Sequence, residues 1–273
     1  MCIFYWGLTL CSLVVTEDLI KEYKSYLEVL GPRTRRDYVN VMNRYKGLEL
    51  GSNVLYVVHG WTDEEVEKSV AQHAGMDFKV AVGSYYVATV LNKAPKTIVF
   101  TRFGTTMKYV VENYKWILVL GGSGPNMIHL SFYMGANAVD GVAWRNAARR
   151  KEIIVPGLGV YALNNSKRRK LDDKAINTLK SWWGHELNPF KDLPINEFMT
   201  LALKDFKTLA LWNAAALKIE EQIANEYAND PERYYRYLQR RWENNSFWRN
   251  VLKLVSSNYV QSTLTVYLRQ TYK

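Results

Sequence analysis

The chain has 273 residues, a net charge of +10 and an aromatic content of 14%. Its 48% hydrophobic content supports a sizeable core and excludes a disordered or low-complexity protein. The surplus of cations beside many tyrosines and tryptophans is typical of a nucleic-acid-binding surface, although a basic protein whose aromatic side chains fill its core has the same totals.

The two cysteines, Cys2 and Cys11, both lie in the apolar opening MCIFYWGLTLCSLVV. Two cysteines provide neither a disulfide framework nor a cysteine-based zinc site, which favours a reducing, cytoplasmic setting. The opening is too short to span a bilayer and lacks the basic leader of a signal peptide. We therefore expect a buried strand here and no membrane partner.

From residue 1 to about 160, short apolar runs that end in Gly, Asn, His or Asp alternate with amphipathic segments. The predicted strands are residues 37–43, 53–60, 78–84, 96–104, 116–124, 136–141 and 152–159. The predicted helices are residues 16–30, 62–75, 104–115 and 126–135, the second of which has Thr62 as N-cap and Glu65 at the capping-box position. Strands that alternate with helices predict a parallel sheet with both faces covered.

Six or seven such units in about 160 residues favour an α/β fold of the TIM (β/α)8-type barrel over residues 1–165. A doubly wound open sheet gives similar local patterns and is the alternative. Residues 166–273 have almost no strand pattern and are expected to form a helical, basic region that packs on the barrel. Within it, residues 195–227 predict helix, and residues 231–273 predict one or two more.

Four segments are similar, in consistent order from about residue 37 to 225, to the queuine and archaeosine tRNA-guanine transglycosylases. They are VVHGWTDEE (57–65), VAVGS (80–84), the stretch from WILVLGGSG to VPG (116–157) and LALWNAAALKIEEQI (209–223). The DNA-modifying guanine transglycosylases, which share the barrel, match equally well. The resemblance implies exchange of a guanine base in tRNA or DNA for a free 7-deazaguanine-type base, without a cofactor.

The resemblance makes Asp140 the nucleophile, and the chemistry requires such a group. A carboxylate can attack the sugar C1′ from the face opposite the departing guanine and form an ester, which the incoming base then displaces. Asp140 ends a predicted strand, and Gly141 lets a substrate approach closely. The alternative is that Asp140 is the N-cap of the helix that follows.

The same resemblance implies which residues contact the base. Backbone groups at Val82, Gly83 and Ser84 would receive guanine, and His59 stands where the family has glutamine. The remaining candidates are Gly121 and Gly122, from the GGSG turn, and Asn43 (or Asn40), which stands near a family aspartate. The alternatives are a strand-end histidine bonded to a nearby turn, and a tight turn after the strand.

Two family features are absent from this sequence. The general-base aspartate has no counterpart, because no acid precedes Glu17; either the first strand is shortened and the base is lost, or another group accepts the proton. The zinc site of three cysteines and one histidine cannot form, so no metal is expected. His185 is then expected to be a packed residue beside Trp182 and Trp183.

Several cationic clusters flank Asp140 and recur toward the C-terminus, and each taken alone is also consistent with an ordinary solvated face. Arg233, Arg236 and Arg240 fall on one helical face. The residues predicted to contact nucleic acid are Arg145, Arg149, Arg150, Lys151, Lys167, Arg168, Arg169, Lys170, Arg240 and Arg241.

Three functions stay open at this point. The first is a transglycosylase on tRNA or DNA, working as a homodimer or with another chain. The second is a catalytically degenerate paralogue that binds nucleic acid for a partner subunit, which the missing acids favour. The third is an unrelated TIM-barrel enzyme on small phosphorylated substrates, prompted by the glycine-rich strand ends.

Overall fold

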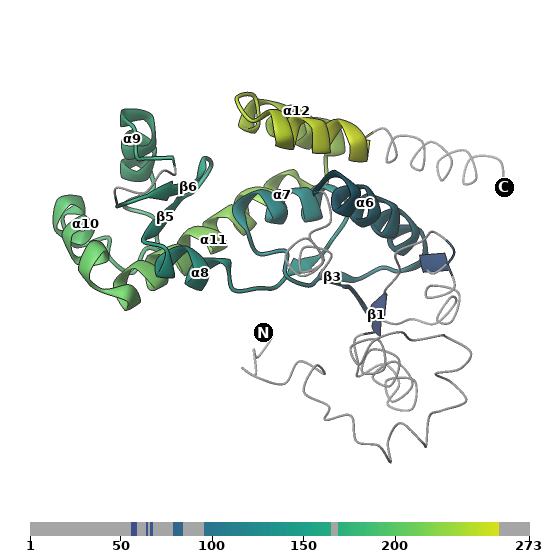
Figure 1. Cartoon of the computed structure of the whole chain (residues 1–273), viewed down its shortest axis with the longest axis horizontal. Coiled ribbons are helices and arrows are strands. Elements are labelled where there is room, and N and C mark those ends of the chain that lie inside the picture. The colour runs from purple at the N-terminus through teal and green to yellow at the C-terminus, as the bar shows by residue number, and fades with distance from the viewer. Residues whose placement is uncertain are drawn as a thin grey trace, which may run out of the picture.

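The computed structural model describes residues 56–58, 64, 66–67, 79–83, 96–164 and 169–256, and its fold is mixed α/β (Figure 1). The strands are β1 Tyr56–Val58, β2 Val80–Val82, β3 Ile117–Val119, β4 Ala138–Val139, β5 Glu152–Val155 and β6 Gly159–Ala162. The helices are α6 Lys96–Asn113, α7 Pro125–Tyr133, α8 Ala143–Arg149, α9 Asp173–Ser181, α10 Ile195–Lys204, α11 Phe206–Ala228 and α12 Pro231–Arg241. Residues 246–256 are helical as well.

Strands β1 to β4 form one parallel sheet in the order β1-β2-β3-β4, so each strand pairs with the next along the chain. Val58 pairs with Val82, and Val119 pairs with both Val82 and Val139, so the carboxyl ends of the strands meet at one edge. All three side chains of β2 are buried, which means that both faces of this strand are covered. The predicted parallel sheet is confirmed at these four strands.

In the part of the chain that the structure describes, this sheet is open and does not close into a barrel. The order of its four strands runs in one direction, without the reversal that defines a doubly wound sheet. The strand predicted at residues 37–43 and the helix predicted at 16–30 lie outside the described residues. At residues 62–75 the described positions, 64 and 66–67, are helical.

The strand predicted at residues 96–104 is wrong, because these residues begin helix α6. Val99, Phe100, Phe103, Met107 and Val110 are all buried, and their spacing places them on one face of a single helix. The segment begins with β-branched residues, which are typical of strands, and this composition led to the wrong prediction. The helix continues past Gly104, although glycine disfavours helix. A methyl group there would meet the side chain of residue 255 at 3.4 Å, so the small residue fits a close contact with the C-terminal helical segment.

The strand predicted at residues 152–159 begins as predicted but folds back on itself. β5 pairs antiparallel with β6, and the two form a separate two-stranded sheet. Gly157 and Gly159 adopt φ angles of +82° and +114°, which a tight reversal needs and which other residues rarely adopt. This segment therefore does not extend the parallel sheet.

Residues 169–256 are mainly helical, as predicted, and they pack on the first part of the described chain. Helix α11 contacts α7, α8 and β5, and α12 lies against α7 on the side away from the sheet (Figure 1). The helix predicted over 195–227 is two helices, because Asp205 leaves α10 and caps α11 by accepting a hydrogen bond from Thr208 N at 2.7 Å. None of the described helices combines the length and apolar character needed to cross a membrane.

Candidate active site

A glycine-rich loop follows β3 and meets the end of β4 at the carboxyl edge of the parallel sheet. Leu120 N donates a hydrogen bond to Val82 O at 3.0 Å, which joins the start of the loop to β2. On the other side, Asp140 N donates to Val119 O at 3.2 Å. The predicted nucleophile thus lies beside the loop, at the edge where parallel α/β sheets bind ligands.

The carboxylate of Asp140 is held by the loop. Its Oδ1 accepts a hydrogen bond from Gly121 N at 2.6 Å, and the residue as a whole is half-buried. Its Oδ2 accepts no hydrogen bond from the described residues. Asp140 does not cap the next helix, because the N-cap of α8 is Val142 and the Asp140 carboxylate accepts its hydrogen bond from Gly121 N, not from that helix. The N-cap alternative is therefore wrong.

The turn after Asp140 is packed against the same loop. Gly141 has a φ of +145°, and a Cβ at this position would collide with the side chain of Ser123. The Ser123 Oγ in turn accepts a hydrogen bond from Ala143 N at 3.2 Å. Both the backbone conformation and the available space therefore require glycine at 141, and together they fix the direction of the preceding carboxylate.

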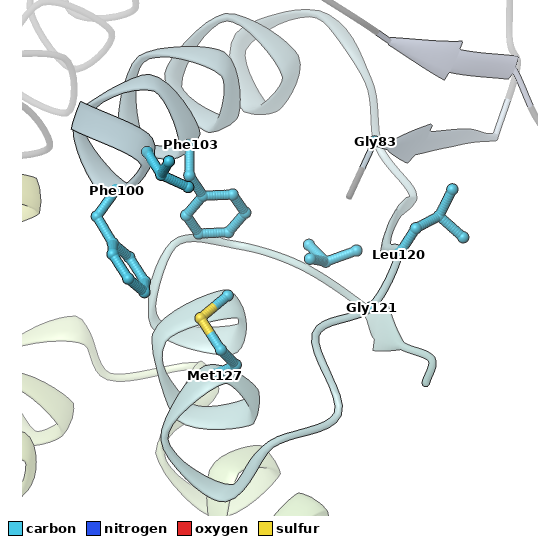
Figure 2. A pocket seen from close by; sticks show the side chains of 8 residues that line it. Gly83, Phe100, Phe103, Leu120, Gly121 and Met127 are labelled. Atoms are coloured by element: carbon cyan, nitrogen blue, oxygen red, sulfur yellow. The ribbon is translucent and has the colours of Figure 1, made fainter. Parts of the chain in front are cut away.

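A small apolar pocket is connected to this carboxylate through Gly121, which lines the pocket and donates to Asp140; Asp140 itself is not among the lining residues. Figure 2 shows Phe103 from α6 and Met127 from α7 on one side of it and Gly83 and Gly121 on the strand side. Its lining is Gly83, Val99, Phe100, Phe103, Val119, Leu120, Gly121 and Met127. The cavity measures about 10 Å³, enough for about one water molecule. In this closed form it does not accommodate a purine base.

The backbone groups predicted to receive a base are engaged with the sheet. Gly83 N donates to Val58 O at 3.2 Å, and Val82 O accepts from Leu120 N. Gly122 is buried, and a Cβ there would lie 3.0 Å from Val119 Cγ1, so this glycine serves close packing. Three other predicted base contacts, His59, Ser84 and Asn43, lie outside the described residues.

The cations that follow Asp140 are carried by helix α8 and its C-terminal end. Arg149 and Arg150 are exposed, whereas Arg145 and Lys151 are half-buried. Arg150 Nε donates to Glu152 Oε2 at 2.8 Å, so part of its charge is neutralised within the chain. Helix α8 has seven residues and is about 9 Å long. Arg149 is its last residue and therefore lies about two helical turns beyond the segment that carries Asp140.

Three of the more distant cations are at the surface. Arg169, Lys170 and Arg240 are exposed, and the Arg169 guanidinium lies 4.4 Å from the ring centroid of Tyr161. Arg233 and Arg236, predicted to share a face of the same helix as Arg240, are exposed too. Lys167 and Arg168 lie outside the described residues.

Arg241 is a correction. Its side chain is 2% exposed and its Nη2 lies 2.7 Å from Glu220 Oε1, so it does not face a phosphate backbone. Its neighbour Arg240 points in a different direction from α12 and is exposed. One position along a helix is a rotation of about 100°, and this rotation separates a surface cation from a buried one.

No cluster of three or more His, Cys, Asp or Glu side chains that could hold a metal occurs among the described residues. The ring of His185 lies 5.6 Å from that of Trp182, as expected of a packed histidine, and its Nδ1 accepts from Leu187 N at 3.2 Å. Comparison with models of protein families gave no match, and neither did comparison with curated protein sequences.

Sequence reasoning missed two buried polar groups on α11. Asn213 joins this helix to β5: its Oδ1 accepts from Ile154 N at 2.8 Å, and its Nδ2 donates to Glu152 O at 2.9 Å. Glu220 is fully buried and binds both Arg241 and His129. In the sequence, Asn213, Glu220 and His129 each stand out as a polar residue on the apolar face of a predicted helix. Their hydrogen-bond partners could not be predicted, because the bonds from His129 and Asn213 span about 60 to 110 positions.

Proposed function

We propose that this chain is a transglycosylase that exchanges a guanine base in tRNA or DNA for a free 7-deazaguanine-type base, with Asp140 as nucleophile. One observation carries the proposal: the Asp140 carboxylate lies at the carboxyl edge of a parallel sheet, with one oxygen fixed by Gly121 N and the other free of hydrogen bonds from the described residues. The resemblance of the surrounding sequence to guanine transglycosylases supports the same assignment.

The geometry suits a double displacement. Oδ2 of Asp140 attacks C1′ while guanine leaves with the electron pair of the glycosidic bond, and the ester is then cleaved by attack of the incoming base at C1′. The hydrogen bond from Gly121 holds the carboxylate in one orientation, so little reorganisation is needed. A low-polarity pocket beside it keeps water from the sugar.

A base enters this site only after the pocket opens. Phe103 and Met127 come from two different helices and close the pocket from the side opposite the strands (Figure 2). Displacement of these two side chains would expose Gly83 and Gly121 to a flipped base. The exposed arginines of α8 and α12 would bind the phosphates on either side.

The order of the strands supports the prediction of a TIM-type barrel. We propose that residues 1–165 form a TIM-type barrel, because strands β1 to β4 follow one another in a parallel sheet without a reversal. In the same proposal the protein acts in the cytoplasm, as a homodimer or with another chain.

A second candidate is a degenerate paralogue that binds nucleic acid for a catalytic partner. One observation favours it: no titratable side chain is present among the residues that line the pocket, so neither a general acid to protonate the leaving guanine nor a general base to deprotonate the incoming base is found there. Loss of such a group typically costs a factor of about 10² to 10⁴ in rate.

Trapping of the covalent intermediate tests the proposal. The full chain is incubated with guanine-containing tRNA or a DNA oligonucleotide, and adducts are resolved in denaturing gels, alongside incorporation of labelled guanine. We expect an adduct and label incorporation with wild type and with Asp192→Asn, an exposed matched control, and neither with Asp140→Asn.

The other results are informative as well. Tight, salt-sensitive binding without adduct or exchange in any variant supports the degenerate paralogue. An adduct that persists in Asp140→Asn overturns the assignment of the nucleophile. Weak binding of both polymers at physiological salt overturns both candidates and favours an enzyme on small phosphorylated substrates.

A further inference from the structure

A buried cluster of charged and aromatic side chains joins helices α7, α11 and α12. At its centre Glu220 Oε2 lies 2.8 Å from His129 Nε2, and Glu220 Oε1 accepts hydrogen bonds from Arg241 Nη2 at 2.7 Å and from Gly157 N at 3.0 Å. The side chains of Glu220 and His129 are 0% exposed. We call Glu220, His129, Arg241 and Tyr234 the Glu220 cluster.

A neutral imidazole satisfies all the hydrogen bonds of the cluster. His129 Nδ1 lies 2.9 Å from the hydroxyl of Tyr234, and Nε2 faces the carboxylate of Glu220. Since an ionised carboxylate only accepts, Nε2 carries the hydrogen, and Nδ1 accepts one from the Tyr234 hydroxyl. A second proton on His129 would turn Nδ1 into a donor, reverse the bond to Tyr234, and place a second cation beside Arg241 on one carboxylate.

The pKa values agree with this arrangement. Burial, together with the charge of Arg241, lowers the pKa of His129 to about 4. Burial alone would raise the pKa of Glu220, but the Arg241 charge and the His129 hydrogen bond outweigh it and bring it to about 2. At neutral pH the cluster therefore holds one ion pair and one neutral histidine.

The other groups that face His129 are one carboxylate, one guanidinium and four tyrosines. The titratable and charged groups that face the imidazole from the described parts of the packed elements are Glu220 and Tyr227 of α11, Tyr234, Tyr237 and Arg241 of α12, and Tyr133 of α7. Burial raises the pKa of Tyr234 and of Tyr237 above the usual tyrosine value. Tyrosines stay neutral below that value, so uptake of a proton by the cluster falls on His129 first and Glu220 second.

Helix α12 depends on this cluster for its placement. It has 11 residues, and a helix of that length is marginal in water without tertiary packing. Its buried side includes Tyr234, Leu238 and, at its C-cap, Trp242, whose Nε1 donates to Asn126 Oδ1 at 3.0 Å. Because the charges are buried, an unpaired member is costly, and protonation of one member weakens the whole contact.

We propose that the Glu220 cluster is an acid-sensitive attachment, in which proton uptake by His129 releases helix α12, with its exposed arginines, from α7 and α11. The proposal rests on the shared carboxylate and the reversed Tyr234 bond, and it is independent of the transglycosylase assignment. It makes the position of a cationic face dependent on pH.

The direction and the size of the pH effect on docking of α12 follow from the difference between the pKa values of His129 in the docked and released states. The docked state has a His129 pKa of about 4, whereas an exposed histidine has 6.5, so the docked state binds fewer protons and acid favours release. The stabilisation from this histidine is complete above pH 6.5 and is lost between pH 6.5 and pH 4. The docking equilibrium falls at most about tenfold per pH unit in that window, or about 20-fold from pH 7 to pH 5. Below about pH 4.5, protonation of Glu220 in the released state adds to the effect.

Hydrogen exchange of the full chain tests this, because protection of amides 232–241 reports opening of α12 without any substrate. Rates at pH 7, 6 and 5 are corrected for the intrinsic pH dependence, and helix α9 serves as internal reference. In wild type we expect protection of α12 to fall about 20-fold between pH 7 and pH 5, while that of α9 changes less than threefold. His129→Gln keeps one donor and one acceptor but takes up no proton, so its α12 protection should be independent of pH.

His185→Gln is the matched control and should behave as wild type, because His185 lies outside the cluster. Constant protection of α12 in wild type, or an equal loss in His129→Gln, overturns the proposal. If His129→Gln fails to fold, the His129 imidazole of the wild type is titrated by NMR instead. A midpoint near pH 4 supports the proposal, and one near 6.5 overturns it.

Discussion

Alanine at position 141 should destabilise the protein more than alanine at any glycine that has free space around it. The φ of +145° costs an L side chain about 1–3 kcal/mol, and the overlap of its Cβ with the Ser123 side chain costs about 1–3 kcal/mol more. The sum of about 2–6 kcal/mol corresponds to a fall in Tm of at least about 5 °C, at about 2–4 °C per kcal/mol for a chain of this size.

Two other glycines separate the causes. Gly157→Ala has a φ of +82° but nothing within 4 Å of the new Cβ, so it should cost only the backbone term of about 1–2 kcal/mol. Gly184 has neither a positive φ nor a neighbouring atom within 4 Å of the new Cβ, so Gly184→Ala should leave the stability almost unchanged. Thermal unfolding of the three variants should rank them in that order. Adding Ser123→Ala should recover part of the loss in Gly141→Ala and none in Gly157→Ala.

The explanation fails if Gly141→Ala unfolds at the same temperature as Gly157→Ala. It also fails if Ser123→Ala brings no recovery in the double variant, since the contact with Ser123 would then not exist. A large loss of base exchange in Gly141→Ala, with little loss of Tm, would show that the turn positions Asp140 more than it stabilises the fold.

Three further predictions concern single positions. Asn213→Leu removes two buried hydrogen bonds to the backbone of β5 and should cost about 2–6 kcal/mol by urea unfolding, whereas the exposed Asn196→Ala should cost less than about 0.5 kcal/mol. Met107→Ala should cost about 2–5 kcal/mol in the same assay, because its side chain is fully buried in the face of α6 that packs on the core. Arg240→Gln should weaken binding of a DNA oligonucleotide and reduce the slope of log affinity against log salt by about 1, with no change in Tm.

The strands of the parallel sheet were predictable because each one is a short apolar run whose end is marked by a polar residue or a glycine. In β2 to β4 these marks fall within two residues of the observed ends, at Gly83, Gly121 and Asp140. Such patterns are local, and parallel pairing follows from the helices between them. The placement of Asp140 beside the glycine-rich loop was predictable for the same reason.

The errors share a cause, which is that local pattern does not show what lies on the other side of a segment. The β-branched residues at the start of α6 predict a strand. The structure shows instead that the buried positions before and after its glycine form one helical face. β5 reads as a further parallel strand, but the glycines that follow it turn the chain back. Arg241 reads as a surface cation because its partner, Glu220, is 21 positions away on another helix.

The Glu220 cluster and the glycine-rich loop are connected through one short helix. α7 begins at Pro125, directly after the loop, and His129 lies four residues, or about 6 Å, farther along the same helix. Met127, which lines the pocket, is between them. A change in the docking of α12 on His129 therefore acts on the helix that closes the pocket beside Asp140. If the two are coupled, the acid limb of base exchange should be reduced in His129→Gln and unchanged in His185→Gln; if exchange falls with acid equally in both, the attachment of α12 and the chemistry at Asp140 are independent.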